Sequence, residues 1–581
     1  MRVAEEKSFT THDGTELFYR YWPAKGGRAD RAIVLFHRGH EHSGRLQHIV
    51  DELRLEDIPM FAWDARGHGR SPGVRGYSPS LAASVKDVDV FIRHISGHYA
   101  VRPEDVAVIA QSVGAVLVAT WAHDYAPKVR CLVLASPAFK VRLYVPFARA
   151  GLKLLHGVFG NFFVNSYVKA RFLTHDAERI ESYNRDSLIT RPISVNILLA
   201  LYDAAERVIE DAQAILAPTQ LLVSGADWVV HLAPQLAFYE RLGSSVKEQH
   251  ALPGFYHDTL GEKDRHLALD KVREFVLRVY AQRPPAVSLV RADQRGYTRD
   301  EENRLRQPLP LWSPRNVAFA LMRVGLRTLG RLSDGVRLGI RTGFDSGSTL
   351  DYVYRNQAAG VTFLGRLIDR GYLDSVGWRG IRVRKAHLER TIAHAAGQLR
   401  AQGRPVRIAD IAAGHGRYVL EAVQKLAPGP ESVLLRDFSE MNVRDGARLI
   451  AEKGLQGTAR FERADAFDEN GVASIEPRPT IGIVSGLYEL FPDNSMVLAS
   501  LRGLARAVEP GGYLVYTGQP WHPQLELIAR TLTSHRDHAP WVMRRRTQAE
   551  MDQLVESVGF SKRDQWTDDW GIFTVSLAIR S

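Results

Sequence analysis

Residues 106–120, which read VAVIAQSVGAVLVAT, decide the fold of the first half of the chain. The apolar run 106–110 predicts a buried strand, and the run from Ala115 onward is compatible with a helix. The turn between them carries small residues, which let the backbone bend sharply enough to expose a serine hydroxyl. Ser112 is therefore the candidate nucleophile of a strand–turn–helix elbow. A turn serine that only caps a helix is the alternative, because so short a string is weak evidence by itself.

Further short apolar runs flank this element and alternate with helical patterns. They are residues 32–36, 60–63, 132–135 and 221–223 in the first half, and 406–410, 432–435, 480–484 and 512–516 in the second. Such alternation predicts mostly parallel sheets with helices on both faces. A chain of 581 residues also exceeds the roughly 250–300 residues that one hydrophobic core serves. We therefore expect two α/β domains.

The composition is that of an ordinary globular protein, with 45% apolar and 24% charged residues. The formal net charge of +11 favours an anionic partner and leaves open whether this is nucleic acid, an acidic lipid surface or a charged substrate. The lone Cys131 can form no intramolecular disulfide and lies in an apolar run, which favours a buried strand position and a cytoplasmic protein. A charged N-terminus and the lack of an apolar run of about 18 residues predict neither a signal peptide nor a membrane-spanning helix.

Four further motifs surround the candidate nucleophile. HRGHEHSGR at 37–45 follows the first long strand, and DARGHGRS at 64–71 follows the next. SGAD at 224–227 and GFYHD at 254–258 come after the serine. In this order the motifs resemble those of the monoglyceride lipase and lysophospholipase branch of the α/β-hydrolase family.

That resemblance covers residues 8 to 280 and implies the α/β-hydrolase fold. It implies a catalytic triad of Ser112, Asp227 and His257, in which the histidine removes the serine proton and the aspartate fixes the histidine tautomer. Backbone N–H groups near Gly39 and Val113 are expected to form the oxyanion hole.

Two residues depart from the family pattern. Ala110 replaces the first glycine of the elbow, and Arg38 replaces the glycine after the loop histidine, which leaves the shape of the oxyanion loop open. Residues 139–200 stand where the family inserts its lid, and they mix apolar with basic side chains. Such a lid suits an acyl chain with an anionic head group or one presented at a membrane. A plain helical cap over a small polar ester is the alternative.

A second loop of small residues, DIAAGHG at 410–416, follows the strand pattern at 406–410. Small residues there allow the backbone to approach a ligand closely, and the helix that follows can face the polar groups of that ligand. Asp437 closes the next strand, at roughly the 20-residue spacing of an acid that holds a ribose. A dinucleotide-dependent dehydrogenase shows the same spacing and is the alternative.

The string D-x-A-x-G-x-G resembles the first motif of class I S-adenosylmethionine-dependent methyltransferases. The resemblance covers about residues 346–581 and includes the turn at 509–514 and an expected hairpin at 566–579. It implies a Rossmann-like fold that binds S-adenosyl-L-methionine. The implied cofactor-binding residues are Asp410, Ala412, Gly414, Gly416, Asp437 and, near the adenine, Asp465 and Ala466. No metal site is predicted.

The segment 485–491 reads SGLYELF where nucleic-acid amino methyltransferases carry an NPPY-type string. Base methylation is therefore disfavoured, and we expect small-molecule or lipid substrates and no nucleic-acid partner. Tyr488, Glu489, Trp521 and His522 lie near expected carboxyl ends of strands. They either face the methyl acceptor or serve ordinary packing.

The domains are expected at 1–284 and 346–581, joined by a polar linker at 285–345. Within this linker, a period of 3.6 residues between Pro314 and Arg341 separates a basic face from an apolar face. The basic face carries Arg323, Arg327, Arg331, Arg337 and Arg341. The helix either lies on an anionic membrane or packs against a domain, and its glycines argue against one unbroken helix.

Together, these patterns predict a bifunctional enzyme of lipid metabolism. A serine ester hydrolase of the lysophospholipase or monoacylglycerol lipase type is fused to an S-adenosylmethionine-dependent methyltransferase. We expect it in the cytoplasm, with peripheral contact at the inner membrane face. The alternatives are a thioesterase fused to a small-molecule methyltransferase, and a catalytically silent adaptor that binds lipid surfaces.

Overall fold

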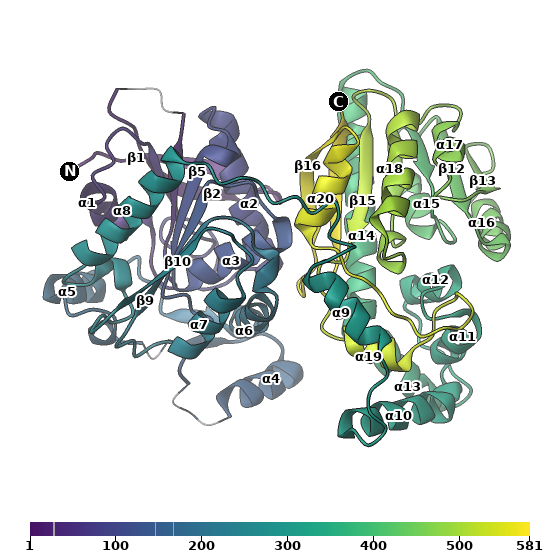
Figure 1. Ribbon diagram of the computed structural model, residues 1–581, viewed down its shortest axis with the longest axis horizontal. Helices are drawn as coiled ribbons and strands as arrows, with labels where there is room; N and C mark the ends of the chain where they lie inside the picture. Colours follow the sequence, from purple (N-terminus) through teal and green to yellow (C-terminus); the bar gives the residue numbers. More distant parts are fainter. Residues whose placement is uncertain (27–29, 144, 146, 167) are drawn as a thin grey trace. The chain divides into compact units, whose positions relative to one another are not determined.

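The computed structural model describes residues 1–26, 30–143, 145, 147–166 and 168–581. The chain divides into two compact units, unit 1 at Met1–Val287 and unit 2 at Ser288–Ser581 (Figure 1). Each unit is built on its own α/β sheet, so the predicted fold class is confirmed. No helix in the described part of the chain is both long enough and apolar enough to cross a bilayer.

An eight-stranded sheet forms the centre of unit 1, in the order β1-β2-β4-β3-β5-β6-β9-β10. Its strands are β1 (Glu5–Thr10), β2 (Glu16–Trp22), β3 (Ala32–Phe36), β4 (Met60–Trp63), β5 (Val106–Gln111), β6 (Cys131–Ala135), β9 (Thr219–Ser224) and β10 (Lys247–Leu252). Strand β2 pairs antiparallel with β1 and β4, and the remaining pairs are parallel. Every residue of β3 through β6 that lies in these strands is buried, including Cys131. Such continuous apolar strands are expected where helices cover both faces.

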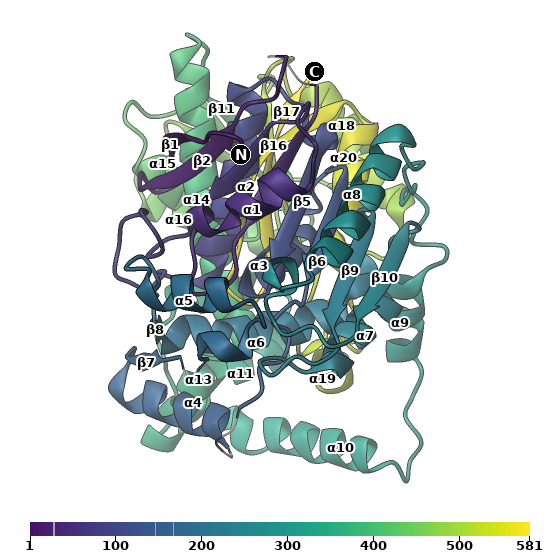
Figure 2. The same ribbon diagram turned by 90° about the vertical axis from the view of Figure 1, so that its left-hand side faces the viewer.

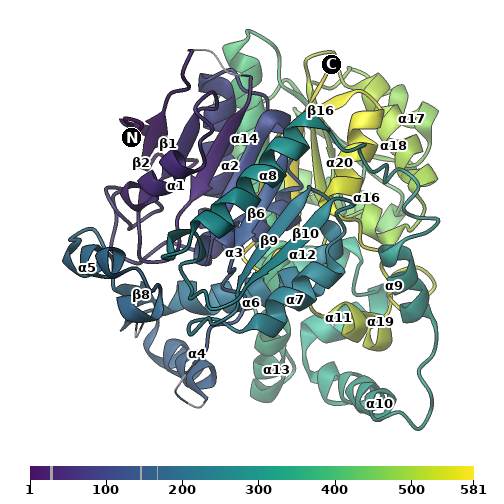
Figure 3. The same ribbon diagram turned by 60° about the vertical axis from the view of Figure 1, so that its left-hand side comes forward.

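Helices cover both faces of this sheet. On one face lie α1 (Gln47–Glu52) and α8 (His266–Ala281), and Figure 3 shows α8 running along the sheet. On the other face lie α2 (Leu81–His98), α3 (Val113–Tyr125), α6 (Val195–Glu210) and α7 (Leu232–Arg241). The two hydrophobic cores on either side therefore hold the strand ends in fixed positions.

A small cap is inserted between β6 and β9. It consists of α4 (Ala148–Phe159), β7 (Phe163–Asn165), α5 (Ala177–Arg185) and β8 (Pro192–Ser194), which gather at one end of the sheet (Figure 2). Helix α4 buries none of its residues, and its Leu154 and Phe159 are 69% and 74% exposed. The expected lid region thus presents apolar side chains to its surroundings.

The sheet of unit 2 has seven strands in the order β13-β12-β11-β14-β15-β17-β16. They are β11 (Arg407–Asp410), β12 (Ser432–Asp437), β13 (Ala459–Arg463), β14 (Ile481–Val484), β15 (Tyr513–Gly518), β16 (Phe560–Thr567) and β17 (Thr574–Arg580). The first five are parallel, whereas β17 runs antiparallel between β15 and β16. The dinucleotide-binding fold instead continues with a sixth parallel strand, so this topology argues against a dehydrogenase.

The helices of unit 2 cover its sheet on both sides. Against one face pack α14 (Val376–Ala401), α15 (Arg417–Gln424) and α16 (Glu440–Glu452). Against the other pack α18 (Asn494–Ala507) and α20 (Gln548–Ser557), with the short α17 (Glu469–Ala473) beside α18. Strand order reverses between β11 and β14, and ligands of such sheets bind outside the carboxyl ends of strands at that reversal.

The segment 285–345 differs from our expectation of a linker, because the chain from Ser288 onward folds as part of unit 2. It forms α9 (Tyr297–Arg306), α10 (Pro314–Arg327) and α11 (Asp334–Thr342). These helices join α12 (Gly347–Arg355) and α13 (Phe363–Leu373) around a hydrophobic core that they share with α14, α19 and segments near the C-terminus. Leu305 and Val336 are buried in that core.

The expected basic helix is in fact two helices with different surroundings. A break at 328–333 separates them, and a Cβ on Gly330 would lie 2.9 Å from Cγ1 of Val336, so a tight approach requires this glycine. Helix α10 buries no residue and lies beside α19 (Leu525–Thr531) (Figure 1). Helix α11 packs inward through Val336. Helix α11 thus fits the expectation of packing against a domain, and the membrane expectation for α10 stays a prediction.

Candidate active sites

Ser112 stands at a sharp turn between β5 and α3. Its φ of 55° and ψ of −117° are a strained conformation for a residue with a side chain, as a nucleophile elbow requires. A Cβ on Gly114 would lie 2.5 Å from the carbonyl oxygen of His37, so this glycine is needed where the elbow passes the preceding loop. Ala110, which stands in place of the family's first glycine, is buried in the core.

The three residues of the predicted triad lie in one hydrogen-bonded chain. Oγ of Ser112 is 2.7 Å from Nε2 of His257, and Nδ1 of the histidine is 2.8 Å from Oδ2 of Asp227. The other oxygen of Asp227 accepts the backbone N–H groups of Val229 and Val230, at 2.7 and 3.0 Å. All three triad side chains are buried. Because Asp227 accepts from Nδ1–H, Nε2 is left free to accept the serine proton.

The electrostatics of Asp227 favour its charged form. Burial alone would raise its pKa, but the neighbouring His257 and the two backbone N–H groups outweigh burial and hold the pKa below its ordinary value. A carboxylate at this position can stabilise the imidazolium that forms when the histidine takes a proton.

The two residues predicted to form the oxyanion hole lie side by side. A Cβ on Gly39 would be 3.0 Å from Cγ2 of Val113, so a larger residue there would have to displace the valine side chain. Both residues line a small cavity of about 80 Å³ next to the elbow. Their roles in binding an oxyanion stay a prediction.

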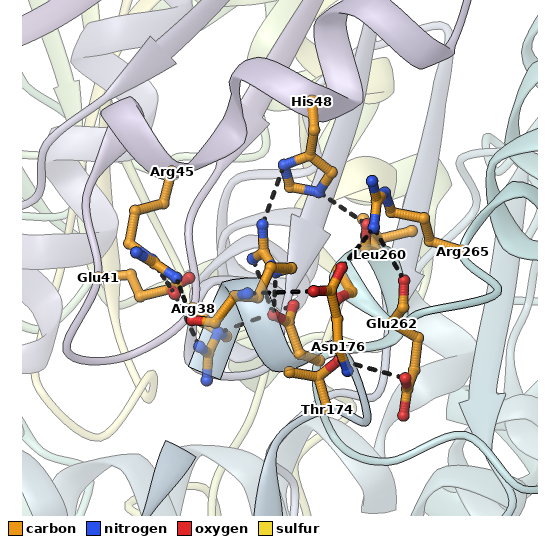
Figure 4. Close-up of polar contacts among 12 residues, drawn as sticks. Arg38, Glu41, Arg45, His48, Thr174, Asp176, Leu260, Glu262 and Arg265 are labelled. Carbon is orange, nitrogen blue, oxygen red and sulfur yellow. Dashed lines mark hydrogen bonds and ion pairs between the residues drawn. The ribbon is translucent and has the colours of Figure 1, made fainter. Parts of the chain in front are cut away.

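Arg38, the unexpected residue of the oxyanion loop, belongs to a buried ionic network (Figure 4). Its Nη2 donates to Glu41 at 2.7 Å, and its Nε is 3.8 Å from Asp258. Arg45 donates to the same Glu41, and Arg179 of the cap helix α5 donates to Asp258 at 2.8 Å. The network thus connects the oxyanion loop, the cap and the residue that follows His257 in the chain.

The same network reaches the triad through Gln111. Its side-chain amide donates to the carbonyl oxygen of His257 and to Oδ1 of Asp258. Arg38 therefore supports the geometry of the loops around the triad, which answers the question that its departure from the family pattern raised. The sequence signal was the alternation of opposite charges at Arg38, Glu41 and Arg45, which are three and four residues apart.

In unit 2, a cavity of about 670 Å³ lies at the carboxyl ends of the strands where their order reverses. The predicted residues that line it are Ala412, Gly414, Gly416, Asp437, Asp465 and Ala466. Oδ2 of Asp437 accepts the backbone N–H of Gly414 at 2.9 Å, which ties the loop to the second strand. A Cβ on Gly416 would lie 2.4 Å from a methyl group of Leu435.

These residues fit an adenine nucleoside. Asp437 offers a carboxylate at the strand end where a ribose hydroxyl pair is held. The exposed apolar side chains of Phe438 and Met441, which also line the cavity, suit an adenine ring.

Asp410 occupies a different place from the one we expected for a cofactor-binding residue. It is fully buried and does not line the cavity as far as the chain is described. Its carboxylate accepts the backbone N–H of Ala412 at 3.1 Å and the hydroxyl of Tyr418. Burial raises the pKa of Asp410 to about 7. Asp410 is thus a support for the loop rather than a ligand contact.

Of the four residues expected near the methyl acceptor, two line a cavity and two make contacts elsewhere. Glu489 and His522 line a second cavity in unit 2, of about 570 Å³. Tyr488 is buried and donates to Ser500 at 3.0 Å, so it serves packing, and Trp521 stacks on Arg545. Sequence reasoning missed Arg384, which lines both cavities from α14. Arg384 lies in a long helix, more than 20 residues before the loop motif in the sequence, and no local pattern marks it as a site residue.

Comparison with known proteins gives a consistent result. A family described as "Putative methyltransferase" matches residues 272–580, and one described as "Serine aminopeptidase, S33" matches residues 27–264. The chain is 58% identical over 580 residues to the uncharacterized protein YnbC of Escherichia coli K12, covering 100% of this chain and 99% of that one. It is 26% identical over 275 residues to the monoacylglycerol lipase of Mycolicibacterium smegmatis, covering 47% of this chain and 96% of that one. A monoglyceride lipase structure from Saccharomyces cerevisiae, 15% identical, matches 48% of this chain and 96% of its own with a TM-score of 0.44.

Proposed function

We propose a function from the premise that this chain belongs to the "Putative methyltransferase" family and carries an α/β-hydrolase domain of the serine aminopeptidase S33 type ahead of it. The proposal is a bifunctional enzyme, in which unit 1 is a serine ester hydrolase and unit 2 is an S-adenosyl-L-methionine-dependent methyltransferase. The observation that carries it is the Ser112–His257–Asp227 hydrogen-bonded chain, present in one polypeptide with a nucleoside-sized cavity in unit 2.

In unit 1, His257 acts as the general base that takes the proton from Ser112 as its Oγ attacks an ester carbonyl. Asp227 keeps the imidazole in the tautomer that leaves Nε2 free. The negative oxygen that develops on the substrate is stabilised by the backbone N–H groups of Gly39 and Val113. The histidine then returns its proton to the leaving alcohol, and water completes the hydrolysis of the acyl-enzyme.

The substrate that we propose for unit 1 is a monoacylglycerol or lysophospholipid. Relatives named as monoacylglycerol lipases support this choice, as does the apolar surface of α4 in the cap. Treatment of the full chain with a fluorophosphonate probe should label Ser112, and Ser112→Ala should abolish both labelling and cleavage of a monoacylglycerol. Methyl transfer should persist in that variant. An unlabelled wild-type chain would instead mean a catalytically silent adaptor.

In unit 2, we propose that the loop at Ala412–Gly416 and the acids Asp437 and Asp465 hold S-adenosyl-L-methionine. This compound supplies an electrophilic methyl group on a sulfonium ion. Asp437 accepts from the ribose hydroxyl groups, while the hydrogen bonds that it accepts from N–H groups of Gly414, Ser439 and Asn442 fix the carboxylate and the loop in place. The buried carboxylate of Asp410 supports the loop by accepting the backbone N–H of Ala412. Isothermal titration of the full chain with S-adenosyl-L-methionine tests this assignment, since Asp437→Ala should weaken binding and Asp569→Ala, at an exposed position, should not.

We also propose that α10 contacts an anionic membrane. Its Leu321 and Val324 are 67% and 57% exposed, the preceding Trp312 is 84% exposed, and Arg327 and Arg331 lie beside them. Apolar side chains flanked by arginines suit an acidic lipid surface, where each arginine contributes about 1 kcal/mol.

Cosedimentation with vesicles tests the membrane proposal. The full chain should bind phosphatidylglycerol vesicles more than phosphatidylcholine vesicles, and salt should weaken binding. The double variant Trp312→Ser with Leu321→Ser should lose binding. Val3→Ser, at a residue that is 82% exposed, is the matched control. Equal binding by the double variant and the control would refute the proposal.

A further inference from the structure

The second cavity of unit 2 adjoins the proposed cofactor cavity. Its volume of about 570 Å³ lies in the range of sites for small organic ligands. Both cavities are lined by Asp345, Leu350, Arg384, Gly486 and Leu490. Large apolar side chains, among them Trp378, Trp541 and Phe573, supply much of the remaining wall. Such a cavity suits a methyl acceptor that has an apolar body and places its reacting group near the shared wall.

Arg384 places a buried cation in this shared wall. Its side chain is 2% exposed, and its Nε finds no acceptor among the residues that the structure describes. Its Nη1 is 3.4 Å from Oε1 of Glu489, a long distance for such a pair, and the guanidinium stacks on the ring of Phe573. A Cβ on Gly486 would lie 3.1 Å from Nη2, so the glycine leaves this nitrogen uncovered on that side. The hydroxyl group of Tyr354 also interacts with this guanidinium, but its buried Nε donor has no acceptor among the described residues, which indicates that a ligand supplies one.

His522 adds a second donor to the same cavity. Its Nδ1 accepts the backbone N–H of Gln524 at 3.0 Å, so Nε2 carries the proton. Burial lowers the pKa of His522 to about 4, which leaves the ring neutral near pH 7. Gly377 faces Nε2 without a side chain to cover it, since a Cβ there would lie 3.1 Å away. The histidine therefore donates a hydrogen bond from Nε2 and does not act as a base.

We propose that the methyl acceptor of unit 2 is the carboxylate of an apolar carboxylic acid. Arg384 binds this carboxylate as an ion pair, and His522 donates a hydrogen bond to it. This inference rests on the proposed methyltransferase function. The Nε–Nη2 edge of a guanidinium matches the two oxygens of a carboxylate, and the hydrocarbon body occupies the apolar cavity.

The chemistry balances without a base. A carboxylate oxygen forms a bond to the methyl carbon of the donor as the carbon–sulfur bond breaks. The electron pair of the broken bond stays on sulfur, which changes from a sulfonium to a neutral thioether. The product is a methyl ester, and no proton moves because the acid is already ionised near neutral pH. An alcohol or amine acceptor would instead need a base such as Glu489.

This acceptor also defines a place in a reaction sequence. The reaction that supplies it is the hydrolysis of an acyl ester, which is the chemistry proposed for unit 1. The two units would then act in succession, the first releasing a carboxylic acid and the second converting it to a methyl ester.

The test uses the full chain with palmitate and with 1-hexadecanol, which have the same chain length. Quenching of tryptophan fluorescence and isothermal titration measure binding, because Trp378 and Trp541 line the cavity. Palmitate should bind at least tenfold more tightly than 1-hexadecanol, and mass spectrometry should detect methyl palmitate when labelled S-adenosyl-L-methionine is added. These measurements on the wild type need no variant to fold.

Two variants at the shared wall sharpen the result. Arg384→Gln should weaken palmitate binding by about 10- to 100-fold, the effect of losing a charge-assisted pair. The palmitate affinity of Arg384→Lys should lie between those of the wild type and Arg384→Gln. Glu489→Gln should strengthen palmitate binding, because it removes the carboxylate that competes with palmitate for Arg384. Loss of methyl transfer in this variant would instead identify Glu489 as a base and overturn the proposal. Palmitate affinity that is the same in the wild type and Arg384→Gln, or methylation of 1-hexadecanol in place of palmitate, would also overturn it. If S-adenosyl-L-methionine itself fails to bind, the proposed function fails instead.

Discussion

Glu41→Gln should destabilise unit 1 far more than the loss of a surface charge. Glu41 is 1% exposed and neutralises two buried guanidinium groups, those of Arg38 and Arg45. Glutamine keeps the shape and one acceptor oxygen but removes the negative charge. The substitution therefore leaves both arginines with less compensation in a site that water does not reach.

The magnitude follows from the burial of the network. Removing one partner of a buried ion pair costs about 3–5 kcal/mol, and the remaining amide oxygen places this case near the lower end. A loss of about 3 kcal/mol corresponds to a fall in Tm of roughly 6–12 °C for a domain of this size. Arg38→Met should cost less, because Glu41 keeps Arg45 and Asp258 keeps Arg179.

The assay must report unit 1 alone, which fluorophosphonate labelling of Ser112 in increasing urea achieves. Glu16→Gln, at an exposed position of β2, is the matched control and should shift the free energy of unfolding by less than about 0.5 kcal/mol. The pH dependence gives a second check. Burial would raise the pKa of Glu41, but the two arginines hold it below the ordinary value of 4.5. The stability from this charge is thus present above pH 4.5 and lost as pH falls through the lower folded-state pKa, so the difference between wild type and variant should shrink in acid. A Glu41→Gln cost equal to that of Glu16→Gln would refute the reasoning.

Three further predictions concern the triad and the cofactor loop. Asp227→Asn should lower kcat for ester cleavage by about 10⁴-fold, because the histidine loses its tautomer, while binding of S-adenosyl-L-methionine, followed by titration, stays the same; a loss below tenfold would contradict the triad. Gly416→Ala should weaken that binding at least tenfold, since the residue has a φ of +74° and its new Cβ would meet Leu435 at 2.4 Å; unchanged affinity by titration would show that the loop adapts. Burial raises the pKa of Asp410 to about 7. Between pH 4 and 7 the folded state therefore keeps a proton on Asp410 that the unfolded state has released. The free energy of unfolding of unit 2 should fall by a few kcal/mol as pH rises from 4 to 7. Asp410→Asn should remove that dependence in urea unfolding curves, and an identical pH profile for both chains would rule out this origin.

The sequence contained enough information for the two sheets and for the convergence of the triad. The apolar runs give the strands, and parallel strands bring their carboxyl ends to one edge of a sheet. Ser112 after β5 and Asp227 after β9 therefore had to lie at the same edge, and His257 after β10 joins them. Their catalytic roles remain predictions that the proposed experiments decide.

Other features could not be read from local patterns. Residues 285–345 have a polar composition typical of a linker, yet α9 is held to unit 2 by side chains from far along the chain. Arg544 donates to Thr298 and Arg545 to Glu301, and both arginines are buried. A run of three arginines at 544–546 normally indicates a solvated surface. These arginines can be buried only because acids and carbonyl groups from elsewhere in the chain accept their hydrogen bonds. Hydrophobic periodicity in the sequence cannot predict such partners.

The position of β17 between β15 and β16 has a consequence for biosynthesis. The chain of unit 1 is complete once residue 287 is made, whereas β15 of unit 2, made at residues 513–518, stays unpaired on one side until residues 574–580 arrive. At about 5–20 residues per second, the roughly 60 residues from the end of β15 to the end of β17 take on the order of 3–12 s. Unit 1 can thus fold first while the growing second half still exposes one edge of an apolar strand, and an unpaired edge of this kind promotes aggregation.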